Sequence, residues 1–315
     1  MDSEGLKKGK VAFLFPGQGS QAVGMGADLW DSFEEAKEIF KRADEVLGYT
    51  LSEICFKGPE EKLKLTENTQ PALLVHSYIL YRLLNFVPSI SAGHSLGEYS
   101  AFLCGGAISF EDAVKIVHKR GKYMQEAVPV GKGAMAAILG AKREDIENSL
   151  RKANGIVEIA NINSHEQIVI SGEKGAVEEV ISILKPPKHV ILPVSAPFHC
   201  SLMKPAEEKL SKELDSINFF DPCFPVVTNV DAKIVKKGEE ARDSLKRQVS
   251  RPVRWLESME LMLEMGISIF VEVGSGKVLS GLLRRIAKNN GKEVEILNVD
   301  GVESLKQVKD YLSSL

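Results

Sequence analysis

The sequence Gly93-His94-Ser95-Leu96-Gly97 sets a serine in a G-x-S-x-G pattern, after an apolar run at 90–92 and before a helical run at 98–103. A serine on a sharp turn from strand to helix projects its hydroxyl over the sheet edge, and small neighbours let the turn close. The helix that follows points free N–H groups at a developing oxyanion, and Leu96 supplies the first of them. The pattern predicts acyl-group chemistry with Ser95 as the nucleophile.

A serine nucleophile needs a base, and histidine is the usual one. The chain has 6 histidines: His76, His94, His118, His165, His189 and His199. His94 adjoins the serine and is expected to buttress the turn, whereas His76 and His118 fall within helical runs. His199 follows an apolar stretch and an irregular segment at 195–198, which predicts a loop near the serine. We expect His199 to be the base; a loop histidine without a role is the alternative.

The glycine-rich turn at 15–22 reads Phe-Pro-Gly-Gln-Gly-Ser-Gln-Ala and also fits the G-x-G-x-x-A dinucleotide fingerprint. That fingerprint requires a second strand ending in an acidic residue about 20 positions on, but the region 34–40 has an amphipathic helical pattern. A Walker phosphate loop also fails, because no lysine followed by serine or threonine closes the turn. The remaining interpretation is a tight turn whose Gln18 N–H is a second oxyanion donor.

The helical run at 109–124 carries an arginine on its apolar stripe. The stripe has spacings of 4, 3 and 4: Ala113, Val117, Arg120 and Met124. A buried guanidinium is unfavourable without an anion, and its fork of N–H groups fits a carboxylate. Arg120 therefore predicts either a carboxylate-bearing ligand or, as the alternative, an arginine that reaches out to solvent or forms an internal ion pair.

The elements around these residues predict an α/β fold with a mainly parallel sheet. Buried strands are indicated at 11–15, 90–92 and 267–273. Helical patterns occupy 33–47, 71–84 with Pro71 in the first turn, and 109–124. Strands alternating with helices favour a helix-covered sheet, and the serine turn is typical of an α/β-hydrolase-like domain.

The middle of the chain has a different pattern. Short strands are indicated at 134–139, 156–162, 167–171 and 189–192, with helices at 142–151 and 175–184. The order β-α-β-β-α-β is typical of a ferredoxin-like unit, and glycines and prolines bracket it. We predict a small ferredoxin-like domain at 128–195 inserted into a large domain of 1–127 and 196–315, with the active site in the cleft between them.

The composition is that of a globular protein: 315 residues, 44% hydrophobic and 26% charged. A formal net charge of -3 disfavours nucleic-acid binding. The 4 cysteines are dispersed and form no C-x-x-C pair, which indicates neither a zinc site nor a disulfide framework. The start lacks an apolar signal core and no run is long enough to span a bilayer, which predicts a cytoplasmic protein, or an organelle-matrix one after loss of a transit peptide.

Five motifs along the chain match one known family in type and in order. They are Phe15-Pro16-Gly17-Gln18-Gly19-Ser20-Gln21, Gly93-His94-Ser95-Leu96-Gly97-Glu98-Tyr99, Arg120-Gly121-Lys122-Tyr123-Met124-Gln125, Asn161 with Asn163, and Pro197-Phe198-His199-Cys200. Together they resemble the malonyl-CoA:acyl carrier protein transacylases of fatty-acid synthesis, over a span from about Val11 to Leu283.

This resemblance implies a ping-pong transfer in which malonyl-CoA acylates Ser95 and the phosphopantetheine thiol of acyl carrier protein then takes the malonyl group. It implies that His199 takes and returns the proton. The N–H groups of Gln18 and Leu96 would hold the oxyanion, and Arg120 would bind the malonyl carboxylate.

The resemblance also implies that Gln248 orients the histidine, commonly through a main-chain carbonyl, which makes the site a Ser-His dyad rather than a full triad. It assigns Phe198 and Asn163 to substrate binding. Phe198 is a departure, because many bacterial relatives have a smaller polar residue before the histidine, and this opens the range of extender units. No metal or other cofactor is implied. The expected partners are malonyl-CoA and a transient acyl carrier protein, with no nucleic acid and no membrane, and the chain is expected to be a monomer.

Two alternatives stay open. A serine esterase or thioesterase of the α/β-hydrolase type shares the serine turn. Such an enzyme would transfer the acyl group to water and would have no use for an arginine that points into the site. A carrier-binding scaffold with a vestigial site is the non-enzyme alternative. The presence of a nucleophile (Ser95), a base (His199) and an arginine that can bind a carboxylate (Arg120) counts against this alternative.

Overall fold

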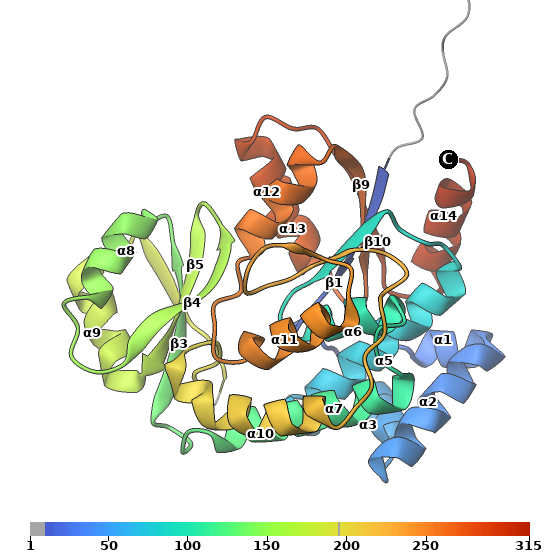
Figure 1. The fold of residues 1–315 in the computed structure, drawn as a ribbon, viewed down its shortest axis with the longest axis horizontal. Helices are drawn as coiled ribbons and strands as arrows, with labels where there is room; N and C mark the ends of the chain where they lie inside the picture. Colours follow the sequence, from blue (N-terminus) through green and yellow to red (C-terminus); the bar gives the residue numbers. More distant parts are fainter. Residues whose placement is uncertain (1–9, 195) are drawn as a thin grey trace, which may run out of the picture.

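The computed structural model describes residues 10–194 and 196–315. The segment 1–9, where the sequence predicts no signal peptide, and Ser195, the last residue of the predicted inserted domain, lie outside the described residues. Within these ranges the chain forms a large helix-covered sheet with a smaller sheet beside it (Figure 1).

The large sheet has 6 strands in the order β10-β9-β1-β2-β7-β8. Their bounds are β1 Lys10–Phe15, β2 Ile90–Gly93, β7 Val226–Val227, β8 Ile234–Val235, β9 Ile267–Val273 and β10 Glu295–Val299. Neighbouring strands run parallel except β8, which is antiparallel to β7. The predicted strands are confirmed as β1, β2 and β9, and the sheet is mainly parallel, as predicted.

Strand β1 lies in the middle of this sheet, and both of its faces are covered. Val11, Phe13 and Phe15 pack into one hydrophobic core, whereas Ala12 and Leu14 pack into another on the opposite face. An unbroken apolar run suits such a position, because successive side chains point to opposite faces. In the register, Phe15 pairs with the residue that ends β2. The carboxyl ends of β1 and β2 therefore meet, which is where ligands bind in open α/β sheets.

Helices cover both faces of the large sheet, some in direct contact with it and others packed on those helices. They are α1 Ala27–Ser32, α2 Glu34–Leu47, α3 Leu51–Lys57, α4 Glu60–Leu63, α5 Thr66–Leu84, α6 Leu96–Cys104, α7 Phe110–Glu126, α10 Lys204–Asp215 after the 3₁₀ turn Ser201–Met203, α11 Gly238–Gln248, α12 Trp255–Glu264, α13 Val278–Asn289 and α14 Val302–Ser313. Helices α12 and α13 cover the face of Ala12 and Leu14. In the described part of the chain, no helix combines the length and the apolar character that crossing a membrane requires.

The predicted start of the helix at Pro71 is wrong. Helix α5 begins at Thr66, so Pro71 lies inside it. A proline there has no N–H for the carbonyl four residues earlier, which belongs to Glu67. His118 of α7 satisfies that carbonyl instead, with Nδ1 2.9 Å from the Glu67 oxygen. This contact from a neighbouring helix explains how α5 tolerates the proline.

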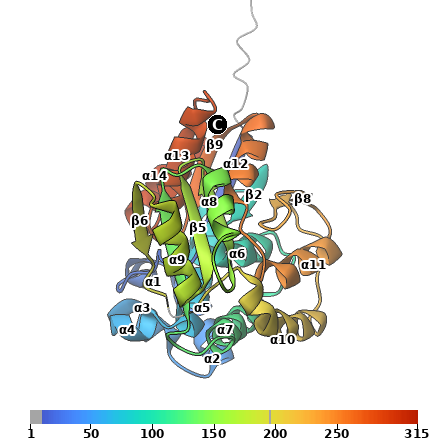
Figure 2. The same cartoon turned by 90° about the vertical axis from the view of Figure 1, so that its left-hand side faces the viewer.

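The small sheet has the order β4-β5-β3-β6 and is antiparallel throughout. Its elements are β3 Gly133–Leu139, α8 Arg143–Leu150, β4 Val157–Ser164, β5 Gln167–Glu173, α9 Lys174–Leu184 and β6 Lys188–Ile191. The predicted order of strands and helices is the order observed. Figure 2 shows α8 and α9 in front of the sheet, on the side away from the large sheet.

Alternation along the small sheet separates two surfaces. Ala136, Ile138 and Ile170 pack with α8 and α9 in a separate core, while Met135 and Val169 line a cavity on the other side. Strand β4 also contacts the segment before α12, because the Ile162 N–H donates to the Val253 carbonyl at 2.9 Å and the Val253 N–H donates to the Ala160 carbonyl at 2.8 Å. The small sheet is therefore hydrogen-bonded to the large part of the molecule.

Candidate active site

Ser95 occupies the sharp turn between β2 and α6, with φ 51° and ψ -106°. A serine with positive φ is unusual and persists only where its surroundings hold it. The flanking glycines are required by close packing: a Cβ on Gly93 would overlap the Gly97 backbone, and a Cβ on Gly97 would overlap the Phe15 carbonyl. The crowding expected from the sequence is thereby confirmed.

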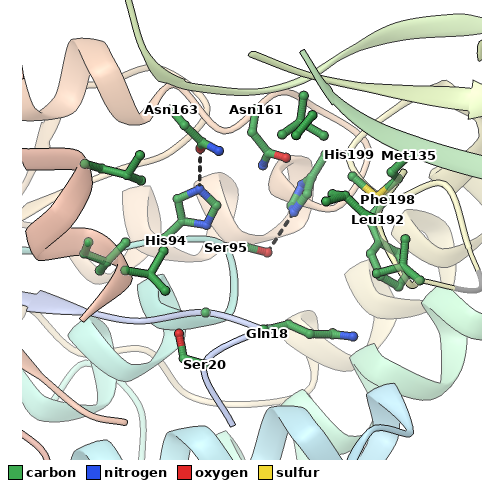
Figure 3. A pocket seen from close by; sticks show the side chains of 18 of the residues that line it. Gln18, Ser20, His94, Ser95, Met135, Asn161, Asn163, Leu192, Phe198 and His199 are labelled. Atoms are coloured by element: carbon green, nitrogen blue, oxygen red, sulfur yellow. Dashed lines mark hydrogen bonds between the residues drawn. The ribbon is translucent and has the colours of Figure 1, made fainter. Parts of the chain in front are cut away.

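The Ser95 hydroxyl points at His199 (Figure 3), with 2.7 Å between Oγ and Nε2. On the other side of the ring, His199 Nδ1 lies 3.0 Å from the main-chain oxygen of Gln248. A carbonyl oxygen can only accept, so Nδ1 carries the proton and Nε2 is free to accept the serine proton. The structure brings together the three residues predicted from sequence, and Gln248 contacts the histidine through its carbonyl.

Burial lowers the pKa of His199 to about 3, and the neighbouring Arg120 cation adds to the effect. The imidazole is therefore neutral at ordinary pH and ready to act as a base. The same shift links stability to pH. The unfolded histidine takes up a proton below its ordinary pKa of 6.5, whereas the folded one resists protonation down to about pH 3. Its contribution to stability is present above pH 6.5 and is lost as the pH falls through that window.

The pH profile of acylation should therefore show no fall in rate near pH 6.5, where an ordinary histidine takes up a proton. We expect kcat/KM for acylation by an acyl-CoA to stay level from about pH 8 to about pH 5, because kcat/KM reports the free enzyme. The Arg120→Gln variant loses the second cause of the shift, so its acid limb should move up toward the ordinary histidine value. Quench-flow measurement of acylation across this pH range checks both proteins. A fall in the wild-type rate near pH 6.5 would contradict the assignment of the buried, neutral His199 as the base.

Arg120 is buried, with 1% of its surface exposed, and it lies against the nucleophile. Its Nη2 donates to Ser95 Oγ at 3.0 Å and to Gln248 Oε1 at 2.9 Å. Its Nη1 donates to Gln70 Oε1 at 2.8 Å, and its Nε has no partner within the described residues. The inward direction predicted from the helical stripe is confirmed. The internal ion pair considered as the alternative is not formed, because no carboxylate of the described residues lies in salt-bridge contact with the guanidinium.

The backbone of the serine turn is held by side chains from distant segments. Asn229 accepts from the Ser95 N–H at 2.8 Å and donates to the Gly93 carbonyl at 2.7 Å. Gln248 Nε2 donates to the Ser95 carbonyl at 2.9 Å. Sequence reasoning missed Asn229. The available signal was a polar residue just after a strand, but β7 has two residues and gives almost no periodicity.

The His94 side chain points away from the hydrogen bonds that join Ser95, His199 and Gln248, as expected for a residue that supports the turn. Its Nε2 lies 2.8 Å from Asn163 Oδ1 (Figure 3), and its ring packs edge-on against Trp255 at 5.5 Å. The Asn163 amide nitrogen donates to Gln167 at 3.2 Å. Asn163 therefore lies in the cavity lining, as predicted for a substrate residue, but its amide is already engaged with protein groups.

A cavity of about 320 Å³ opens above Ser95. Its apolar lining comes from the small sheet, from helices α7 and α13, and from the segment before His199: Met124, Met135, Ala137, Val169, Leu192, Val194, Phe198, Val278, Leu279 and Leu282. Gln18 also lines it, but its side chain donates to Thr66 at 3.3 Å and turns away from the serine. Any oxyanion contact from Gln18 must therefore use its backbone N–H. Leu96 is the first residue of α6, directly after Ser95, where helix N–H groups lack intrahelical partners.

Across residues 10–194 and 196–315, no group of three or more histidine, cysteine, aspartate or glutamate side chains could hold a metal ion. The arrangement instead supplies a serine nucleophile, a neutral imidazole and a buried cation around one cavity. This set can form and break an acyl ester, and the cation favours an acyl group that carries a negative charge.

Comparisons with known proteins agree with this chemistry. Residues 12–303 match the family described as acyl transferase domain. The malonyl CoA-acyl carrier protein transacylase of Haemophilus influenzae is 44% identical over 313 residues, covering 96% of this chain and 99% of that protein. The solved malonyl CoA-acyl carrier protein transacylase of Coxiella burnetii is 40% identical, with a TM-score of 0.93 over 97% of this chain and 98% of the other.

A further solved structure is similar over almost the whole chain. It is a malonyl-transacylase in complex with its type II polyketide synthase acyl-carrier protein. It is 44% identical, with a TM-score of 0.92, covering 96% of this chain and 99% of that one.

Proposed function

The chain belongs to the acyl transferase family, and from that membership and the geometry of the site we propose that it moves a malonyl group from malonyl-CoA to acyl carrier protein through an ester on Ser95. The observation that carries the proposal is the position of Arg120, whose buried guanidinium lies 3.0 Å from the nucleophilic oxygen. An acyl group with a terminal carboxylate, such as malonyl, would meet this cation while its thioester carbonyl lies at the serine.

In the first half-reaction, His199 Nε2 takes the proton as Ser95 Oγ attacks the thioester carbonyl. The backbone N–H groups of Leu96 and Gln18 would stabilise the tetrahedral oxyanion. The Gln248 carbonyl keeps the ring in the required tautomer and stabilises the imidazolium. Collapse of the intermediate breaks the carbon–sulfur bond, and the proton on His199 passes to the coenzyme A thiolate.

The second half-reaction reverses these roles with a different thiol. His199 takes the proton of the carrier's phosphopantetheine thiol, whose sulfur attacks the malonyl ester. The ester bond breaks and Ser95 recovers the proton. No cofactor is needed in this scheme, because serine, imidazole and backbone N–H groups perform every transfer. Phe198 and the apolar lining would limit the size of the acyl group.

The remaining finer assignments are part of the same proposal. We class the large part, 1–127 and 196–315, as α/β-hydrolase-like, on the support of the serine turn after a parallel strand. We class 128–195 as a ferredoxin-like insertion, on the support of its order of strands and helices. A cytoplasmic monomer acting on a transient carrier remains our expectation.

A partition assay tests the proposed function against hydrolysis. Enzyme, radiolabelled malonyl-CoA and holo acyl carrier protein are mixed, and label is counted on the enzyme, on the carrier and in free malonate. We expect label on the enzyme without carrier, and transfer to the carrier when it is added. A serine esterase or thioesterase would release most label as free malonate whether or not the carrier is present.

A further inference from the structure

Glu98 is a buried acidic residue that the mechanism above does not use. It lies in the first turn of α6, with 0% of its surface exposed. Its Oε2 accepts from the Asn229 N–H and from Gln248 Nε2, both at 2.9 Å. Its Oε1 accepts from the Ser244 hydroxyl at 2.8 Å. Because both partners of Oε2 are N–H donors, these contacts suit the ionised carboxylate.

One side-chain amide connects this carboxylate to the cation of the active site. Gln248 Oε1 accepts from Arg120 Nη2 at 2.9 Å, while its Nε2 donates to Glu98. The amide therefore has a fixed orientation, with its negative end toward Arg120 and its positive end toward Glu98. All three side chains are buried, so water does not screen the charges at its two ends.

The two charges also compensate each other electrostatically. Burial raises the pKa of Glu98, while the hydrogen bonds from Asn229, Gln248 and Ser244 and, to a smaller degree, the Arg120 cation act against that rise. Burial lowers the pKa of Arg120, and Tyr99 and Glu98 act against that fall. A buried charge is strongly unfavourable alone and tolerable when an opposite charge lies nearby. Neither residue forms a salt bridge with another side chain in the described parts of the chain.

We infer that Glu98 is the counter-ion of Arg120, acting through the Gln248 amide, and that it limits how tightly the guanidinium holds the carboxylate of the acyl group. The inference rests on the proposed malonyl transfer. An uncompensated buried cation would bind that carboxylate tightly in the ground state, which does not speed the chemical step. Glu98 is thus a positioning residue, not a catalytic one, because it acts on the substrate through Arg120.

The test compares Glu98 with Glu98→Gln, both in the non-acylating Ser95→Ala background. Calorimetry gives the dissociation constants of malonyl-CoA and acetyl-CoA for each protein. Glutamine keeps the shape but removes the charge, so malonyl-CoA should bind about tenfold more tightly, while acetyl-CoA changes little. If Glu98 only supports the serine turn, both ligands should change alike.

Two further variants decide the cause. With Arg120→Met also present, Glu98→Gln should no longer change the ratio of the two dissociation constants, because the cation is gone. Should Glu98→Gln not fold, Ser244→Ala removes a hydrogen bond that favours the ionised carboxylate and keeps the Glu98 pKa lower. Glu98 should then take up a proton more readily, and lowering the pH should shift the ratio in the same direction as Glu98→Gln does. An unchanged ratio in the folded variants overturns the inference.

The proposed function fails separately in the same experiment. If the Ser95→Ala protein with Glu98 intact shows no preference for malonyl-CoA over acetyl-CoA, then recognition of the carboxylate by Arg120 is wrong. A clear preference that Glu98→Gln leaves unaltered rejects the role of Glu98 alone.

Discussion

Replacing Ser95 with alanine should abolish the malonyl-enzyme, because the variant has no oxygen to carry the acyl group. Transfer to the carrier should fall to background for the same reason. The cavity itself changes little, since the substitution removes one oxygen and leaves Arg120, His199 and the apolar lining in place. The measurement is protein-bound label after incubation with radiolabelled malonyl-CoA and acid precipitation.

Two variants frame this result. Ser95→Cys keeps a nucleophile and should retain some label. His199→Ala keeps the serine and should label slowly, by a factor of roughly 10²–10⁴ below wild type. Full labelling of Ser95→Ala would show that the acyl group is carried elsewhere, and the whole mechanism would be rejected.

Replacing Arg120 with alanine should reverse the acyl preference rather than merely weaken the enzyme. Malonyl-CoA loses its charge-assisted hydrogen bonds, and we expect kcat/KM for it to fall by roughly 10³-fold. Acetyl-CoA has no carboxylate to bind the guanidinium, so its kcat/KM should hold steady or rise. The ratio of the two values for kcat/KM, measured in each protein, reports the change directly.

The matched control is Lys122→Ala, on the exposed face of the same helix. It should leave the ratio unchanged, which separates the effect of the buried guanidinium from a loss of positive charge in general. Arg120→Lys keeps the charge but loses the fork of donors, so an intermediate ratio is expected. If Arg120→Ala does not alter the ratio, the arginine is structural and malonyl selection lies elsewhere.

Local patterns predicted most of the fold because they report burial. The run at 11–15 lies between two cores, and the alternation in the small sheet separates a helix-covered face from a cavity face. Strands β7, β8 and β10 were not predicted; β7 and β8 have two residues each, too few to show a period. Pro71 misled the helix start because a side chain of another helix, His118, satisfies the carbonyl that the proline leaves free.

The residues of the site also fall into a group that the sequence identifies and a group that it does not. Ser95, His199 and Arg120 were identifiable because a motif, a loop position and a helical stripe each leave a local signal. Asn229 and Glu98 leave almost no such signal, since their roles depend on contacts between segments more than 100 residues apart, as the sequence separations of 134 and 131 show. Such contacts exist only after the chain has folded, and no spacing along the sequence anticipates them.

The walls of the cavity come from two structural sources. Ser95 and Arg120 belong to the large-sheet part, whereas Met135, Ala137 and Val169 come from the small sheet. Substitutions on the small sheet can therefore change the space left for the acyl group, while the hydrogen bonds from Ser95 to His199 and from His199 to the Gln248 carbonyl stay intact. During evolution, substitutions confined to the small sheet could change which acyl group the cavity accepts. The residues that set the reaction rate, which belong to the large-sheet part, would stay unchanged.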